Sequence, residues 1–564
     1  MDRRLLLAIA LMLGVTILPS LIWPPQRPAP APRTADTVSR DATRGTAPAA
    51  PPAVLPPVVA ASPAVVGSAA AAVDTGAERT VVVESELYRY EFSTRGARLR
   101  SATLLEYRAF APTDSGPAQL LPETSRLLAY AFVVGRDTLD FATSRFEPDM
   151  DSIEVGAGGA TLAWTGRVGL RDVRLVYRFQ ADQYLFDVEG EIGGGQEGVL
   201  LVGLGPRLRS IDADTVADIR SYGVVTKANR TERLDFRSLD PGEVRELPGP
   251  FEWVAIKSKY FVEVVLAFDE GAPRFGGALA VGGARPGRFE TDVAVLTSLP
   301  VPDGRFRHGV YVGPQEFRRL AHLGHDLEDV NPYGWILRPV IRPFANFIVR
   351  ILLWMHETLS ISYGWVLILF GILVRVLLWP LNQKAMRSST AMQAIQPELK
   401  AIQDRYKNDP QKLQQEMMKL YKEHGVNPLG GCVPLLIPMP VLFALFFVFA
   451  NTIEFRGVSF LWLPDLSRAD PYYIIPLFMG VSMFVLSWLG QRGMPPNPQT
   501  RMMMYVMPVM FTFLFLNFSS GLNLYYAVSN VASLPQQWLI SRARQRKLGD
   551  RNPANGQTAR RRDG

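Results

Sequence analysis

The sequence predicts a polytopic α-helical membrane protein with a large all-β domain on the outer side of the membrane. Long apolar runs dominate residues 361–540, whereas residues 81–317 show the alternation of apolar and polar residues typical of half-buried strands. Lysine and arginine gather in alternate loops between the apolar runs. A chain of 564 residues is too long for one ordinary core, so at least two units are expected.

The first apolar run, residues 5–23, follows Arg3 and Arg4. It is long for the core of a signal peptide, and no small residues mark a cleavage site at its end. We therefore favour an uncleaved transmembrane anchor over residues 1–23, with a cleaved signal peptide as the alternative. Residues 24–79 are rich in proline, alanine and threonine. This composition predicts a disordered tether.

The β domain is expected over residues 80–325. Residues 80–99 alternate apolar and polar side chains, residues 173–192 suggest two strands around a turn, and residues 260–268 suggest another strand. Glycine-rich segments such as "GAGG" and "GGGQEG" separate these strands. No strand and helix flank them in the order of a nucleotide-binding loop, so we interpret them as turns. The pattern predicts a β-sandwich.

Few residues suggest a reactive or metal-binding site. Cys432 is the single cysteine, which excludes an intramolecular disulfide and a zinc site built on thiolates. His322 and His325 are interpreted as surface residues near a helix end rather than as metal ligands. No Ser/His/Asp arrangement is evident. We therefore predict that the chain is not an enzyme and that it carries no cofactor and no metal.

Residues 342–362 suggest an amphipathic helix. Arg350, His356 and Glu357 interrupt this segment, so it is a poor membrane span. We predict that it lies flat on the outer membrane surface. Its apolar residues share one helical face: Phe344, Phe347, Ile348, Ile351, Leu352, Met355 and Leu359.

Five further spans are predicted, which gives six with the anchor. They cover residues 363–381, 432–450, 472–489, 502–518 and 522–540. The segment 382–431 carries eight lysines and arginines, and the tail 541–564 is also strongly basic. The alternate loop 451–471 has two arginines against three acidic residues. Both termini are therefore expected in the cytoplasm and the β domain outside.

The segment 384–428 predicts a cytoplasmic hairpin of two antiparallel helices. Apolar residues recur at spacings of three and four up to Tyr406, and again after the break at Asn408, Asp409 and Pro410. A partner-binding role and a merely solvated surface are both open interpretations. The candidate partner contacts are Met392, Ile395, Leu399, Tyr406 and Met417.

Arg375 lies inside the span 363–381, roughly 9 Å from its inner end at about 1.5 Å per residue. An arginine at the bilayer midplane costs about 2.5–3.5 kcal/mol, and snorkelling toward the cytoplasm would relieve part of this cost. The final span carries a polar stripe flanked by Ser529 and Gln536. These groups either hydrogen-bond across a helix interface or, with Arg375, line a wet cavity open to the cytoplasm. The stripe consists of Asn523, Tyr526, Asn530, Ser533 and Gln537.

Four segments resemble the YidC/Oxa/Alb family of membrane protein insertases, in its Gram-negative form. They read "VRVLLWPL", "NPLGGCVPLLIPMPVLFALF", "DPYYIIPLFMG" and "SGLNLYYAVSN". The match is strong over residues 361–540 and looser over the anchor, tether and β domain. The resemblance implies a bacterial inner-membrane insertase and chaperone with a five-helix core and a periplasmic β-supersandwich. It also implies a hydrophilic groove open to the cytoplasm and to lipid.

The resemblance assigns roles to particular residues. The family's groove arginine falls on Arg375, and its paired tyrosines fall on Tyr525 and Tyr526. Some relatives carry a hydroxyl residue where this chain has Gly371, and relatives often have proline where it has Ser519. The candidate groove comprises Arg375, Asn523, Tyr525, Tyr526, Asn530, Ser533 and Gln537.

The expected partners are nascent membrane proteins, the Sec translocon, membrane lipid, and ribosomes or targeting factors, but not DNA. The basic tail would bind ribosomal RNA or only anionic lipid. Its candidate residues are Arg542, Arg544, Arg546 and Lys547.

Other functions fit the sequence less well. A secondary transporter using the polar cavity for a small solute is the alternative, but the spans show no acidic residue for a proton relay and no inverted repeat. An intramembrane protease would need a Ser/His or paired-Asp set. A purely structural anchor would leave the polar stripe and the hairpin without a purpose.

Overall fold

The computed structural model describes residues 77–550 except 113, 268–273, 288–290, 332–337, 381, 384–394, 426–438 and 493–497. The predicted anchor, the tether up to residue 76, Met392, Cys432 and the end of the tail from residue 551 lie outside the described residues. All elements described below belong to one compact unit, which lies within residues 72–564.

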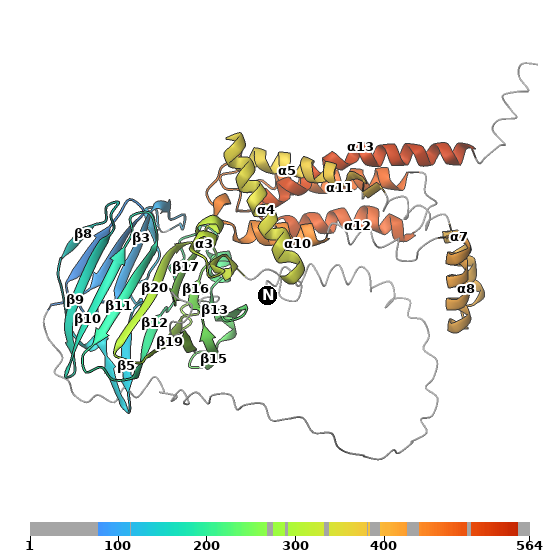
Figure 1. Cartoon of the computed structure of the whole chain (residues 1–564). Coiled ribbons are helices and arrows are strands. Elements are labelled where there is room, and N and C mark those ends of the chain that lie inside the picture. The colour runs from blue at the N-terminus through green and yellow to red at the C-terminus, as the bar shows by residue number, and fades with distance from the viewer. Residues whose placement is uncertain are drawn as a thin grey trace, which may run out of the picture. The chain divides into compact units, whose positions relative to one another are not determined.

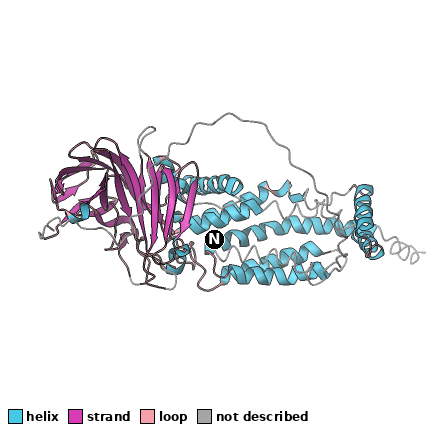
Figure 2. Ribbon diagram, turned by 90° about the horizontal axis from the view of Figure 1, so that it is seen from below, coloured by secondary structure: helices cyan, strands magenta, loops and turns pink. Residues whose placement is uncertain are grey.

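Residues 80–314 form three sheets, shown as magenta strands in Figure 2. Neighbouring strands are antiparallel, except for the parallel pair β1 and β8. The five-stranded sheet has the order β4 (Pro117–Gln119), β3 (Leu99–Arg108), β2 (Tyr88–Ser93), β1 (Thr80–Glu84), β8 (Ser152–Glu154). The nine-stranded sheet has the order β14 (Thr231–Asp235), β13 (Gly223–Lys227), β16 (Trp253–Lys257), β17 (Phe261–Leu266), β20 (Arg305–Pro314), β11 (Leu185–Ile192), β10 (Arg171–Phe179), β9 (Ala160–Val168), β7 (Phe146–Pro148). The six-stranded sheet has the order β15 (Val244–Phe251), β18 (Phe275–Gly282), β19 (Val293–Val301), β12 (Gly198–Leu204), β5 (Tyr130–Val134), β6 (Asp137–Asp140).

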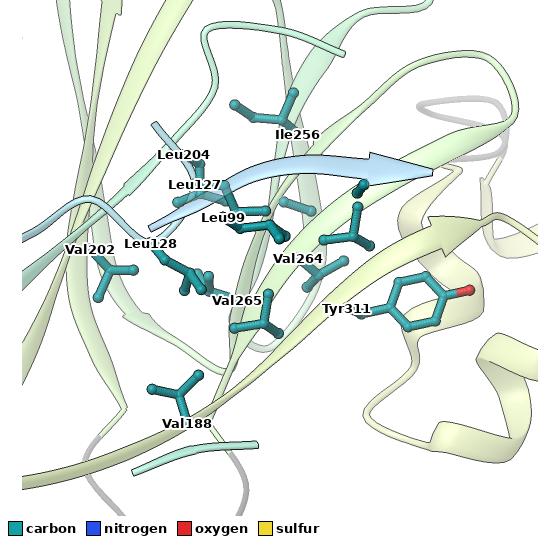
Figure 3. Close-up of a cluster of buried hydrophobic side chains, with 14 of the residues drawn as sticks. Leu99, Leu127, Leu128, Val188, Val202, Leu204, Ile256, Val264, Val265 and Tyr311 are labelled. Carbon is teal, nitrogen blue, oxygen red and sulfur yellow. The ribbon is translucent and has the colours of Figure 1, made fainter. Parts of the chain in front are cut away.

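One apolar core lies where the three sheets meet. Leu99, Val202 and Val265 come from different sheets and gather in one cluster (Figure 3). In β10 every second residue is buried, which is the alternation expected of a strand with one covered face. β10 and β11 pair as a hairpin with Tyr177 opposite Val188, so the two strands predicted over 173–192 are confirmed. The predicted strand at 260–268 is β17.

Short helices complete the β region: α2 (Thr215–Ile219), α3 (Phe317–Leu323), η1 (Phe141–Thr143), η2 (Phe236–Ser238) and η3 (Leu327–Val330). The glycine-rich segments form turns, as expected. Gly159 and Gly195 adopt positive φ angles in these turns, a conformation that other residues rarely adopt. The resulting domain is rich in β-structure, as predicted.

Glu263 lies at the centre of β17 and is fully buried. Its Oε1 accepts a hydrogen bond from the Gly205 N–H at 2.7 Å, whereas Oε2 has no hydrogen-bond partner among the described residues. Burial raises the pKa of Glu263 to about 7. The carboxyl is therefore expected to stay protonated in the folded state at pH values where it ionises in the unfolded chain.

The stability of the β region should consequently fall as pH rises from about 4.5 toward 7, by an amount on the order of 3 kcal/mol from Glu263 alone. Glu263→Gln should flatten this part of the profile, because the amide does not ionise. Denaturant unfolding followed by tryptophan fluorescence across this pH range measures the effect. Glu147→Gln, at an exposed site, is the matched control. An unchanged slope in Glu263→Gln would contradict the assignment.

The remaining helices follow the β region along the chain (Figure 1). They are α4 (Arg338–Leu359), α5 (Tyr363–Leu377), α7 (Gln396–Arg405), α8 (Pro410–Glu423), α10 (Met439–Asn451), η6 (Ile453–Phe455), α11 (Ile474–Gln491), α12 (Pro498–Phe515) and α13 (Ser520–Asp550). α13 packs along both α5 and α11, α12 packs on α11, and α10 packs on α4. α13 continues past residue 540 into the basic residues, since arginine, glutamine and lysine are good helix formers.

Among the described helices, α11 is long and apolar enough to cross a bilayer by itself. Residues 341–359 of α4 and α5 pass the same criterion only together, and they meet at a bend of 120°. Val441–Asn451 and Met504–Phe515 are shorter apolar segments. The count of six spans therefore stays a prediction.

The amphipathic face predicted for residues 342–362 is divided in the structure. Ile348 and Leu352 are buried in the packing of α4, whereas Phe344 and Phe347 remain exposed. α10 packs against α4 and accounts for part of the buried side. The exposed phenylalanines leave an apolar strip available to a membrane surface.

The loop between α10 and α11 is joined to the β region by a buried ion pair. The Arg456 Nε donates to Asp212 Oδ1, and both side chains are less than one-tenth exposed. The guanidinium also lies 4.6 Å from the ring centre of Phe110 and 5.1 Å from that of Phe261. Arg456 therefore fills a pocket with an acidic group and aromatic walls, an arrangement that favours a planar cation.

Candidate functional site

The candidate site lies along α5 and α13, which cross closely at Gly371. A Cβ atom at this position would lie 3.2 Å from Cγ1 of Val528 and 3.5 Å from the carbonyl oxygen of Tyr525. Small residues permit such close packing between helices in membranes. The chain thus has glycine at a point where α13 leaves little space.

Arg375 follows one turn later on α5 and is half-buried. Its Nε is buried without a hydrogen-bond partner among the described residues. Just over one turn before Arg375, Phe370 of α5 packs on Tyr525 of α13, with 5.8 Å between the ring centres. The guanidinium is therefore positioned between α5 and α13 and keeps hydrogen-bonding capacity that the described residues leave unused.

Several members of the polar stripe hydrogen-bond across helix interfaces. Asn530 Nδ2 donates to Ser482 Oγ on α11 at 3.2 Å. Asn523 Nδ2 donates at 3.0 Å to the carbonyl oxygen of Phe515, which stabilises the turn between α12 and α13. Gln536, which flanks the stripe, donates at 3.1 Å to the carbonyl oxygen of Trp379 beyond α5. Part of the stripe thus hydrogen-bonds across helix interfaces, which is one of the two alternatives considered from the sequence.

Other polar atoms in the same region are left unpaired. The Tyr526 hydroxyl, Asn523 Oδ1 and Gln536 Oε1 are buried and have no hydrogen-bond partner among the described residues. The Tyr526 ring is held edge-on by Phe515 at 5.5 Å and by Tyr525 at 5.4 Å. An unpaired polar group costs several kcal/mol in hydrocarbon, so this region favours water or a polar polypeptide over lipid tails.

The two remaining stripe residues differ in their contacts: Ser533 bonds within α13, and Gln537 contacts α11. The Ser533 Oγ donates to the Ser529 carbonyl oxygen within α13 at 2.5 Å. Gln537 packs against Gly490 of α11, where a Cβ would lie 2.7 Å from its Nε2. The candidate groove residues of α13 therefore do not share one neighbour: Asn530 and Gln537 contact α11, whereas Asn523 and Tyr526 contact Phe515 of α12. Sequence reasoning missed Ser482 and the Trp379 carbonyl; a serine within an apolar span was the one available signal.

The hairpin candidates lie on α7 and α8. Asp409 caps α8 by accepting a hydrogen bond from the Lys412 N–H at 3.1 Å, and Pro410 occupies the first turn. Ile395 is buried, whereas Leu399, Tyr406 and Met417 are half-buried. These apolar residues are thus partly used in packing, and Met418 of α8 is an exposed apolar side chain.

The tail candidates belong to α13, where Arg542 and Arg546 are exposed. The side chains of Arg544 and Lys547 lie outside the described set. Arg542 lies over the Trp538 ring at 5.0 Å, and Arg492 lies over the Trp488 ring at 3.7 Å. Tryptophan beside arginine is typical of the interface between a bilayer and water.

Comparisons with known proteins cover nearly the whole chain. Residues 80–355 match the family model of the YidC periplasmic domain, and residues 354–547 match that of the 60Kd inner membrane protein. The membrane protein insertase YidC of Chlorobaculum parvum is 31% identical, covering 96% of this chain and 94% of the relative. The YidC of Ralstonia nicotianae is also 31% identical, covering 86% of this chain and 88% of the relative.

A match to a solved structure spans most of both chains. The crystal structure of an active YidC insertase with its first transmembrane domain resolved is 20% identical, covering 82% of this chain and 93% of that chain, with a TM-score of 0.32.

Proposed function

The chain belongs to the YidC family of membrane protein insertases, and we propose that it inserts nascent proteins into the bacterial inner membrane through a hydrophilic groove between α5, α11 and α13. The groove opens to the cytoplasm and to lipid. The observation that carries this proposal is the set of buried, unpaired polar atoms on Arg375, Tyr526 and Gln536. Their hydrogen-bonding capacity is satisfied by water and by the polar parts of a client chain.

In the proposed mechanism, the short outer segment of a client enters the groove from the cytoplasm near Arg375. The client's apolar segment slides along the lipid-exposed side of the groove. The polar segment then crosses a reduced thickness of hydrocarbon, which lowers its desolvation cost. Burial of the client's apolar helix in lipid drives the reaction, at about 0.8 kcal/mol per CH₂ group. The chain acts in this way alone or beside the Sec translocon.

The proposed topology places both termini in the cytoplasm and the β domain in the periplasm. The Trp488–Arg492 and Trp538–Arg542 pairs then mark the cytoplasmic headgroup region. The hairpin of α7 and α8 stands on the same side and offers a surface to ribosomes or targeting factors.

A photocrosslinking amino acid at position 526 tests the groove directly. With a ribosome-stalled membrane protein as client, we expect a crosslink from position 526, because the Tyr526 hydroxyl is a buried group that the client would reach. Position 531 on the same helix is the matched control, since Val531 is 41% exposed. Equal client crosslinking at both positions, or none at position 526, would contradict a groove beside Tyr526.

The basic tail is proposed to contact ribosomal RNA. Deleting residues 541–564 should reduce co-sedimentation with ribosomes at low salt, and the difference from the intact chain should shrink as salt rises, because contacts to phosphate release counterions. Sucrose-gradient sedimentation across a salt series measures this difference. If the deletion sediments with ribosomes as the intact chain does, the tail serves only lipid binding and topology.

A further inference from the structure

A small polar cavity lies where the end of the β region meets α4 and the loop after α10. Its volume is about 20 Å³, which is enough for one water-sized species. Gln315 follows β20, Asn331 follows η3, and Asn451, Thr452 and Glu454 come from the end of α10 and from η6. Three segments that are distant in the sequence therefore line one cavity.

Two buried side-chain atoms around this cavity lack a hydrogen-bond partner among the described residues, and both are acceptors. Glu454 Oε1 accepts a hydrogen bond from the Phe317 N–H at 3.3 Å, but Oε2 is buried without a hydrogen-bond partner among the described residues. Gln315 is 4% exposed and donates its Nε2 to the carbonyl oxygens of Ser258 and Phe261, which leaves Oε1 unpaired within the same described set. The two buried side-chain atoms of the described lining that have no hydrogen-bond partner are therefore both acceptors.

The lining also defines the charge that the cavity prefers. Glu328 joins Glu454 in the lining, and no lysine or arginine is found among the described lining residues. Asn451 donates its Nδ2 to the carbonyl oxygen of Phe447 at 3.0 Å, which leaves its side-chain oxygen available. Carboxylate and amide oxygens are the ligands that hard cations such as Ca²⁺, Mg²⁺ and Na⁺ select.

We propose that this cavity binds one hard metal cation, held by oxygen atoms of Glu454 and Gln315 and supported by Glu328. The bound cation joins the end of the β region to α4 and to the loop after α10, and so stabilises the contact between them. No metal-ligand spacing is evident in the sequence, because the proposed ligands Gln315 and Glu454 lie far apart along the chain.

A proton is the competing occupant of the same carboxylate. Burial raises the pKa of Glu454 to about 7, the nearby Glu316 raises it further, and Arg318 opposes the shift. The metal ions alone are the probes that distinguish these occupants.

The test is thermal unfolding of the full chain in detergent, after chelation and transfer to buffer low in sodium, at pH 8. Ca²⁺, Mg²⁺ and Na⁺ are titrated separately. We expect at least one of them to raise the unfolding midpoint in a saturable manner. Glu454→Gln should shift the midpoint concentration upward by about tenfold or more, since a charged ligand is lost. Glu357→Gln, an exposed carboxylate nearby on α4, is the matched control.

A saturable shift that Glu454→Gln weakens and Glu357→Gln retains supports the site. If Glu454→Gln fails to fold, Glu328→Gln provides the same comparison. An unfolding midpoint that none of the three cations changes, or equal responses from the intact chain and the lining variant, would overturn the proposal and leave a proton or water as the occupant.

Discussion

Arg375→Ala is expected to lower the insertion of clients with acidic outer segments by about tenfold to a hundredfold. Removing the guanidinium removes a charged hydrogen-bond donor, and such interactions contribute about 1.5–3 kcal/mol. The effect should be largest for acidic clients, because the buried Nε of Arg375 is not paired by the described residues and remains available to a carboxylate. Protease protection of newly made client proteins measures insertion.

Arg375→Lys is the matched variant. Because it keeps the charge, it should retain most of the insertion of acidic clients. Lysine lacks the planar, bidentate geometry of the guanidinium, so some insertion should still be lost. A client with a neutral outer segment serves as the internal comparison and should be affected less by Arg375→Ala. Unchanged insertion of every acidic client by Arg375→Ala, at equal protein levels, would rule out the role proposed for this residue.

Arg456→Ala is expected to destabilise the full chain by about 3–5 kcal/mol, because Asp212 would stay buried without its partner. The loss of the guanidinium from between Phe110 and Phe261 adds a packing defect. Thermal unfolding in detergent and limited proteolysis of the loop after α10 measure the effect. The loop should become sensitive to proteolysis at temperatures where the original chain is resistant.

Arg468→Ala is the control for this experiment, since Arg468 is exposed in the same loop. Adding Asp212→Asn to Arg456→Ala should recover part of the stability, because it removes the uncompensated charge. If Arg456→Ala unfolds at the same temperature as Arg468→Ala, the buried pair does not hold the loop to the β region.

Local patterns predicted much of the fold. Alternation identified β10 and β11, since side-chain period is a property of one strand. Helical spacing and the family resemblance placed Arg375 and Tyr526 in one candidate site, and the structure brings α5 and α13 together. Proline and aspartate at the break between α7 and α8 likewise acted as local signals.

Contacts between residues that are distant in the sequence could not be predicted. Arg456 is one of two arginines in an unremarkable loop, and its partner Asp212 lies 244 residues away. The division of the polar stripe between paired and unpaired atoms depends on Ser482 and on a backbone carbonyl, neither of which follows from the spacing along α13. The burial of Ile348 on α4 likewise depends on where α10 packs.

The crossing at Gly371 has a consequence for the energy metabolism of the cell. In the proposed topology, it seals α5 against α13 on the periplasmic side of Arg375, because the Val528 side chain occupies the space beside the glycine. In the proposed groove, this contact would stop ions that enter from the cytoplasm between these two helices. A cell could then keep many copies of the protein in its membrane without dissipating the proton gradient that drives its ATP synthesis.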